Sequence, residues 1–443
     1  MTRTASNKFA YMTVIAVVIA NMIGTGVFTS LGFQLLDLRS GFVLLALWAV
    51  GGLIALCGAM TYAELGAALP RSGGEYNFLS RIYHPGVGFI SGWISATIGF
   101  AAPTALAAMT FAAYTTSVLP QANDYRVEKT IAVALVVLLT ITHSSSRRQS
   151  GGLQSVFTVL KVAVIVIFCI AALIMVGEPQ PLTFLPVSGD ARLLTSGAFA
   201  VSLIYVSYAY TGWNAATYLS SELENPQRDL PRILFAGTAV VTLLYVALNY
   251  VFLRVAPMAD MRGQIEIGFI AAESAFGMAG GRFAGLALAL LLVSTVSAMT
   301  LAGPRVLQVI GEDFPVLDRL SRTNSDGLPY VAIWTQSALT ILFILTSGFE
   351  SILVFAGFTL ALNSFAAVLG VFVLRWRQPD LPRPYRTFGY PLTPIVYLLL
   401  TGWTLGYVLY SRPAEGAFGL AVVASGAIVY VLSTRRAPRP TPG

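Results

Sequence analysis

The chain has 443 residues, of which 56% are hydrophobic and 11% are charged, and its formal net charge is +7 at pH 7. Soluble domains carry about 25% charged residues, so this composition excludes an ordinary water-soluble enzyme. The 27 Lys and Arg residues form no long basic run, which argues against a nucleic-acid-binding surface.

Apolar runs long enough to cross a bilayer follow one another along the whole chain. A spanning helix needs about 20 mostly apolar residues, whereas the strands of a membrane barrel are about 10 residues long and alternate apolar and polar positions. Because backbone amides in hydrocarbon must pair within their own segment, we predict an all-α polytopic membrane protein. Its twelve predicted helices are centred near residues 20, 53, 100, 134, 165, 207, 243, 291, 339, 363, 401 and 425.

The basic residues between the runs predict the orientation. With the N-terminus in the cytoplasm, 18 Lys and Arg residues fall on the cytoplasmic side, 8 on the other side and one inside a run. The positive-inside rule therefore places both termini in the cytoplasm. Arg3 and Lys8 precede the first run, but no small-residue cleavage site follows it, so we interpret it as a spanning helix of a cell (inner) membrane protein.

The first run contains two glycines in the stretch Ile23-Gly24-Thr25-Gly26-Val27. Glycine weakens a helix by about 1 kcal/mol relative to alanine, so this turn can open. An opened turn presents amide N–H groups to a carboxylate and carbonyl groups to an ammonium group. Close packing of small residues between helices is an equally good interpretation when this run is taken alone.

The fifth run carries one charge in its middle. If the run begins near Gly152, Lys161 lies about 14 Å along the helix axis, too deep for its stem to reach the membrane surface. A charge at this depth costs about 2.5–3.5 kcal/mol, so Lys161 should face the protein interior, with Ser297 of the eighth run as a candidate hydroxyl partner. Lys161 either tethers this run to backbone carbonyls as a permanent charge, or is desolvated enough to couple protonation to transport.

The sixth run is also interrupted, at Tyr208-Ala209-Tyr210-Thr211-Gly212-Trp213-Asn214. It lies five helices after the first run, and a unit with an odd number of helices re-enters the membrane in the opposite orientation. Paired interruptions in such inverted halves point to a binding site near the membrane midplane. We predict a single transporter domain, residues 1–443, with repeats at 9–177 and 195–376 and two accessory helices at 389–434.

Three stretches of the chain form a combined pattern. They are Gly24 to Phe28, Tyr62 to Gly66 with Pro70 to Tyr76, and Tyr210 to Asn214 with Glu222, Asn225, Pro226 and Arg228. Together they resemble the amino acid–polyamine–organocation (APC) superfamily of transporters, and the resemblance runs from about residue 9 to the final run. The third stretch is most similar to the L-type amino acid transporters and their bacterial relatives. The resemblance implies a LeuT-like fold of five plus five inverted helices with two added helices.

The resemblance also implies the binding residues. The opened turn at Gly24, Thr25 and Gly26 would bind the substrate carboxylate, and Val27 next to it would belong to the same substrate-binding site. The carbonyls near Ile23 and those of Tyr208, Ala209 and Thr211 would bind the amino group, while Gly212 belongs to the same break and Asn214 lies near the substrate. Relatives have a lysine in the fifth helix where sodium-coupled transporters of this fold hold sodium. Lys161 therefore argues against sodium coupling and leaves exchange and proton symport open.

Acidic residues predict the substrate class by their position. The first, third, sixth, eighth and tenth runs contain none in their middle, since Glu64, Glu222 and Glu350 fall near run ends. A buried cationic side chain without a carboxylate is costly, so we expect neutral L-amino acids and not arginine, lysine or polyamines. Tyr208 forms either one wall of the side-chain pocket or part of the core.

The remaining polar residues are interpreted as structural. We expect ion pairs of Glu64 with Arg71 or Arg81, and of Glu222 with Arg228 or Arg232. His84 and His143 lie at run ends without a ligand cluster, and both cysteines lie inside runs, so neither a metal nor a cofactor is expected. No external-loop cysteine is present to tether a subunit, so substrate and lipid are the expected partners, without an obligatory protein partner.

Other functional classes lack their usual residues. An intramembrane enzyme would need paired carboxylates, a serine with a base, or a histidine cluster. A channel usually has a filter or a ring of charges. The predicted function is therefore sodium-independent secondary transport of amino acids by alternating access, with exchange favoured over proton symport through Lys161.

Overall fold

The computed structural model describes residues 11–71, 73–118, 124–145, 151–217, 223 and 225–436. Its elements are helices, as the composition predicts. In chain order they are α1 (Tyr11–Met22), α2 (Gly26–Gln34), α3 (Gly41–Ala68), α4 (Gly74–Ile82), α5 (Pro85–Ile94), a π-helical turn (Ser95–Gly99), α6 (Ala101–Val118), α7 (Tyr125–Ser145), α8 (Gly151–Met175), α9 (Asp190–Leu194), α10 (Gly197–Ala209), α11 (Pro226–Val255), α12 (Met258–Met261), α13 (Ile267–Asp313), a 3-10 helix (Pro315–Ser321), α14 (Tyr330–Thr346), α15 (Phe349–Arg377), α16 (Leu392–Ser411) and α17 (Pro413–Arg436).

The lengths of these helices confirm a polytopic membrane protein. Within the described residues, nine segments are long and apolar enough to cross a membrane, and three further apolar helices are shorter, at Val159–Met175, Gly197–Ala209 and Tyr330–Thr346. The centres of all twelve predicted runs fall in these segments. The count of twelve spans stays a prediction, because three of the segments are too short to establish it by length alone.

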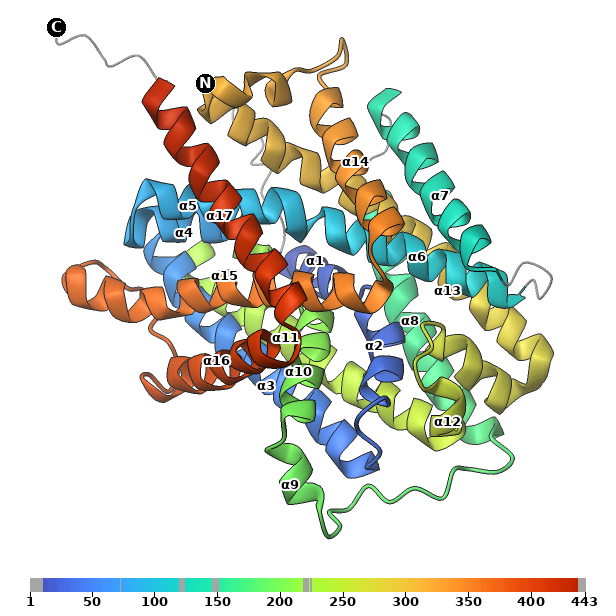
Figure 1. Cartoon of the computed structure of the whole chain (residues 1–443). Helices are drawn as coiled ribbons and strands as arrows, with labels where there is room; N and C mark the ends of the chain where they lie inside the picture. The colour runs from blue at the N-terminus through green and yellow to red at the C-terminus, as the bar shows by residue number, and fades with distance from the viewer. Residues whose placement is uncertain are drawn as a thin grey trace, which may run out of the picture.

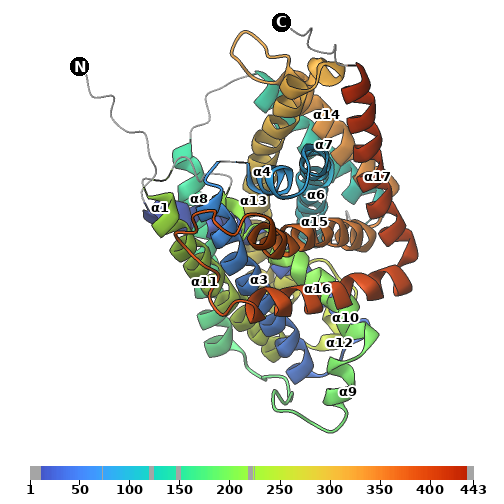
Figure 2. The ribbon, with the colours of Figure 1, turned by 90° about the vertical axis from the view of Figure 1, so that its left-hand side faces the viewer.

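The helices pack side by side in one bundle (Figures 1 and 2), with α15 through its middle and α17 along its outside. Burial agrees with this arrangement, since 61% of the apolar window of α15 is buried in the bundle and only 22% of that of α17. α17 is therefore peripheral, whereas α16, with 33% of its window buried, packs against α3, α10 and α15. The accessory role of these two helices stays a prediction. α8 ends at Met175 and α15 at Arg377, near the predicted repeat boundaries, and the repeat itself stays a prediction.

Small residues determine how closely the central helices approach. α6 packs along α13, where a Cβ atom at Gly268 would lie 2.9 Å from the Tyr114 hydroxyl and one at Gly285 would lie 3.1 Å from the Val118 side chain. On α3, a Cβ atom at Gly51 or Gly52 would overlap side chains of α10 and α11. Small residues of this kind let membrane helices come into direct contact, and here they bring α3 and α11 against the helices that form the site.

Candidate functional site

The first predicted run is broken at the expected glycines. α1 ends at Met22 and α2 begins at Gly26, and the Gly24 N–H donates to the Met22 carbonyl oxygen at 2.8 Å. Thr25 precedes α2 without a capping hydrogen bond from its side chain. In the first turn of α2 the Phe28 N–H donates to the Thr25 carbonyl oxygen at 2.9 Å, while the N–H groups at the very start of a helix have no partner inside it. The break therefore presents the donors of Gly26 and Val27 on one side and the carbonyl end of α1 on the other.

The sixth predicted run is broken at the same level and contacts the first break. α10 ends at Ala209, and Gly212 has a φ of +100°, a conformation that favours glycine. A Cβ atom on Gly212 would lie 2.7 Å from the Asn21 carbonyl oxygen, and one on Gly26 would lie 2.5 Å from the Ala209 Cα atom. The glycines therefore serve both interpretations, since they open the helices and also let the two breaks touch.

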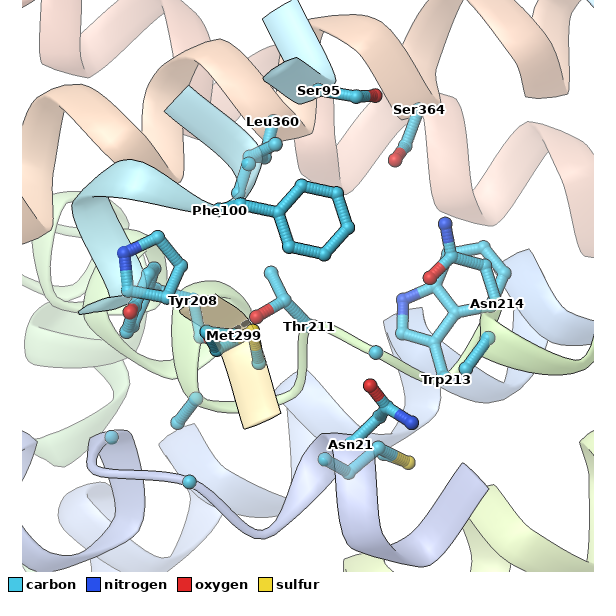
Figure 3. Close-up of a pocket in the computed structure, with 18 of the residues that line it drawn as sticks. Asn21, Ser95, Phe100, Tyr208, Thr211, Trp213, Asn214, Met299, Leu360 and Ser364 are labelled. Carbon is cyan, nitrogen blue, oxygen red and sulfur yellow. Dashed lines mark hydrogen bonds between the residues drawn. The ribbon is translucent and has the colours of Figure 1, made fainter. Parts of the chain in front are cut away.

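A cavity of about 180 Å³ lies between the two breaks. Figure 3 shows its walls, which come from both breaks, the π-helical turn, α13 and α15. Eight of the ten predicted substrate-binding residues line it, namely Gly24, Thr25, Gly26, Tyr208, Ala209, Thr211, Gly212 and Asn214. Lining residues that the sequence analysis did not select include Asn21, Glu75, Ser95, Phe100, Thr295, Met299, Asn363 and Ser364.

Two predicted residues lie elsewhere. Ile23 lines a smaller cavity beside the first one, together with Lys161 and Thr295. Val27 is fully buried in the hydrophobic core. It is not one of the described residues that line the larger cavity. Its branched apolar side chain packs in the core, so only its backbone N–H, in the first turn of α2, is on offer to a ligand.

Tyr245, in the middle of α11, joins the two broken helices. Its fully buried hydroxyl lies 2.5 Å from the Met22 carbonyl oxygen and 3.1 Å from that of Ala209. The sequence analysis missed it because a tyrosine in an apolar run is normally interpreted as a core residue. A buried tyrosine hydroxyl nevertheless usually has a hydrogen-bond partner. The hydroxyl thus holds the carboxyl ends of α1 and α10 together.

The carbonyl groups predicted to bind an ammonium group differ in their availability. The Tyr208 carbonyl oxygen accepts from the Thr211 N–H at 3.0 Å and from the Thr211 Oγ1 at 2.7 Å. Because a carbonyl oxygen has two lone pairs, this position is already filled by protein donors. The Ala209 carbonyl oxygen accepts from the Tyr245 hydroxyl and from neither donor of Thr211. One of its lone pairs is therefore left for a ligand.

Lys161 points into the bundle, as its depth predicts. Its side chain is buried, and Nζ lies 2.9 Å from Thr295 Oγ1 and 3.4 Å from the Ile23 carbonyl oxygen. The predicted pairing of Lys161 with Ser297 is wrong, because the Ser297 hydroxyl is hydrogen-bonded to the Nε2 atom of His143 at 2.9 Å. Two positions along a helix turn a side chain by about 200°, so Thr295 faces Lys161 while Ser297 faces α7.

A carboxylate also reaches the cavity, contrary to the expectation from the apolar runs. Glu75 of α4 is buried, and its Oε1 atom accepts from the Tyr62 hydroxyl at 3.1 Å and from the Asn214 Nδ2 atom. The sequence analysis missed it because α4 is short and lies outside every apolar run. Its tertiary contacts with α5 and α15 bring it against the sixth-run break.

Two carboxylates form ion pairs at the helix ends, and Glu64 has two partners, Arg375 and Arg383, whose Nε atom lies 3.6 Å from Glu64 Oε1. Glu64 accepts from Arg375 at 2.8 and 2.7 Å and from the Thr387 N–H at 2.7 Å, so the predicted pairing with Arg71 or Arg81 is wrong, because packing brings the end of α15 to the end of α3. Glu350 pairs with Arg412 and accepts from Tyr205. The predicted pairing of Glu222 lies outside the described residues.

His84 stabilises a helix end, in agreement with a structural role. Its Nδ1 atom accepts from the Gly86 N–H at 3.0 Å at the start of α5. This bond satisfies one of the first-turn donors of that helix. The histidine therefore acts as a cap at this position.

Comparison with known proteins gives one family for nearly the whole chain. A family model described as amino acid permease matches residues 9–431. The human large neutral amino acids transporter small subunit 2 is 29% identical over 94% of this chain and 78% of its own length. The mouse b(0,+)-type amino acid transporter 1 is 25% identical, over 97% and 88%. The serine/threonine exchanger SteT of Bacillus subtilis is 26% identical over 94% of both chains.

Proposed function

The chain belongs to the amino acid permease family, and we propose that it is a sodium-independent secondary transporter of neutral L-amino acids that works by alternating access. One observation carries this proposal. Two helices break against each other at a cavity that lies between the N–H end of α2 and the carbonyl ends of α1 and α10. Paired broken helices of this kind are typical of midplane binding sites in transporters.

The two ends of a zwitterion fit the two sides of the break. The first turn of α2 offers N–H groups and the positive end of a helix dipole to a carboxylate. The Ala209 carbonyl, with one lone pair left by Tyr245, offers an acceptor to an ammonium group. At about 180 Å³ the cavity is smaller than the roughly 300–1,000 Å³ of pockets for drug-sized ligands, which suits a single amino acid.

Lys161 supports sodium independence. Its ammonium group bonds Thr295 and the carbonyl of Ile23, next to the first break. A second cation placed at the same oxygen atoms would meet the repulsion of a like charge in a medium of low dielectric constant. Lys161 would thus take the structural place of an ion and tether α8 to the break and to α13.

Exchange is the favoured mode, since one relative is named an exchanger. Proton symport through Lys161 is the second candidate. Neutral substrates are favoured because Glu75, the carboxylate at the cavity, already accepts from Asn214 and Tyr62. One relative is also named for large neutral amino acids.

The charge distribution supports insertion in the cell (inner) membrane with both termini in the cytoplasm. The predicted absence of a protein partner has no support from the relatives, because the human one is named a small subunit. The size of the protein after gentle detergent extraction from its own membrane measures whether a second subunit accompanies it.

Uptake into liposomes tests the proposal. The purified protein is reconstituted, and labelled neutral amino acids are offered with and without unlabelled amino acid inside, with and without sodium, and with and without a pH gradient. We expect uptake that needs internal amino acid and ignores sodium. Uptake into empty vesicles driven by a pH gradient would support symport, and no uptake of any amino acid would overturn the proposed function.

A further inference from the structure

The carboxylate of Glu75 and the carboxamide of Asn214 meet at the edge of the cavity. We propose that Glu75 is a positioning residue which turns the carboxamide oxygen of Asn214 toward the substrate, so that the site prefers neutral amino acids whose side chain donates a hydrogen bond. This inference rests on the proposed transport function and adds a substrate class to it. Both residues line the cavity and lie on separate elements, α4 and the turn after α10.

The chemistry of the two groups determines which way the amide points. An ionised carboxylate accepts hydrogen bonds and donates none, whereas a carboxamide has one donor end and one acceptor end. The Asn214 Nδ2 atom donates to the Glu75 Oε1 atom, so the Asn214 oxygen must point away from Glu75. In Figure 3 this oxygen faces the space shared with Phe100 and Thr211.

Glu75 is held in this place by its surroundings. Its side chain is buried and its Oε1 atom also accepts from the Tyr62 hydroxyl of α3 at 3.1 Å. Tyr62 in turn packs edge-on against Trp213, with ring centroids 4.6 Å apart. These contacts hold the carboxylate beside Asn214, so the amide is oriented before a substrate arrives.

The cavity is small, and two further hydroxyl groups line it. They belong to Ser95 of the π-helical turn and Ser364 of α15, which lie at one edge of the cavity in Figure 3. An aliphatic side chain placed here would leave the Asn214 oxygen without a donor, which is costly in a buried site. A hydroxyl side chain would satisfy it, so the site should prefer threonine to valine, which has nearly the same shape.

The ratio of threonine to valine uptake measures this preference directly. Both labelled amino acids are offered together to the same proteoliposomes, so protein amount cancels. We expect the wild-type protein to favour threonine by about 2- to 10-fold, the range of one net hydrogen bond. In Glu75→Gln the new amide can pair with either end of Asn214, so the ratio should fall toward one while valine uptake persists.

Two further variants separate orientation from general damage. Asn214→Leu should lower the ratio as far as Glu75→Gln, and the double variant should lower it no further, because both act through one oxygen. Glu350→Gln removes a carboxylate from the ion pair with Arg412, outside the cavity, and should leave the ratio at the wild-type value whatever it does to the rate.

The outcomes that overturn the inference differ from those that overturn transport. Equal uptake of threonine and valine by the wild-type protein, or an unchanged ratio in Glu75→Gln, overturns the role of Glu75 while amino acid transport stands. Lysine uptake that Glu75→Gln abolishes would make Glu75 a direct contact of a cationic side chain, which also overturns it. No uptake of any amino acid by the wild-type protein overturns the proposed function itself.

Discussion

The hydroxyl of Tyr245 lies 2.5 Å from the carbonyl oxygen of Met22, the last residue of α1. The same hydroxyl is 3.1 Å from the last carbonyl of α10, that of Ala209. One buried side chain of an unbroken helix thus connects both broken ones. Movement of either break relative to α11 would have to exchange or break this contact.

Tyr245→Phe keeps the aromatic ring and removes only the hydroxyl that contacts the Met22 and Ala209 carbonyl oxygens. The Met22 carbonyl oxygen would keep the Gly24 N–H, whereas the Ala209 carbonyl oxygen would lose the Tyr245 hydroxyl. An unsatisfied buried carbonyl costs about 1–3 kcal/mol, so we expect uptake of a neutral amino acid to fall at least about fivefold. The initial rate in proteoliposomes measures it. Tyr83→Phe is the control, because the Tyr83 hydroxyl also donates to a backbone carbonyl, that of Ala366, away from the breaks. Equal loss in both variants would contradict a special role for Tyr245.

Lys161→Ala removes the contacts of α8 with Ile23 and Thr295. We expect transport to fall by about tenfold or more in a protein that still elutes as a folded monodisperse particle, since one lost charged hydrogen bond is worth about 1.5–3 kcal/mol. Thr295→Val, which deletes one of the two contacts, should have a smaller effect. Ser297→Ala is the control, and full activity of Lys161→Ala would remove the lysine from the mechanism.

Gly26→Ala tests the contact between the two breaks. The new Cβ atom would lie 2.5 Å from the Ala209 Cα atom, and backbone atoms cannot yield as a flexible side chain can. We expect a lower melting temperature in detergent and loss of uptake. Gly406→Ala in α16, where a Cβ meets no atom within 4 Å, should raise stability by about 0.4–1 kcal/mol. A stable and active Gly26→Ala protein would contradict the close approach.

Arg375→Ala removes the main partner of the buried Glu64 carboxylate. Loss of one member of a buried pair costs about 3–5 kcal/mol, and we expect about 2 kcal/mol here because the arginine side chain is 23% exposed and Thr387 still donates to Glu64. Thermal unfolding in detergent measures the change. Arg377→Ala, which loses only a bond to the Ile82 carbonyl, should cost less, and the reverse order would show that the ion pair contributes little.

Properties that depend on neighbouring residues along the chain were predictable. The apolar runs predicted the helices, because a backbone in hydrocarbon must satisfy its own hydrogen bonds. The glycines around Thr25 and at Gly212 predicted both breaks, because helix propensity is a local property. The depth of Lys161 along its run predicted that it would face the interior.

Contacts between helices were decided only by the tertiary structure. The sequence analysis paired Lys161 with Ser297 and Glu64 with Arg71 or Arg81, and it overlooked Tyr245 and Glu75. In each case the partner lies on a helix whose rotation and depth depend on how small residues such as Gly51 and Gly52 let helices approach. A shift of two positions turns a side chain by about 200°, so a pattern that locates a helix still leaves open which residues face its neighbours.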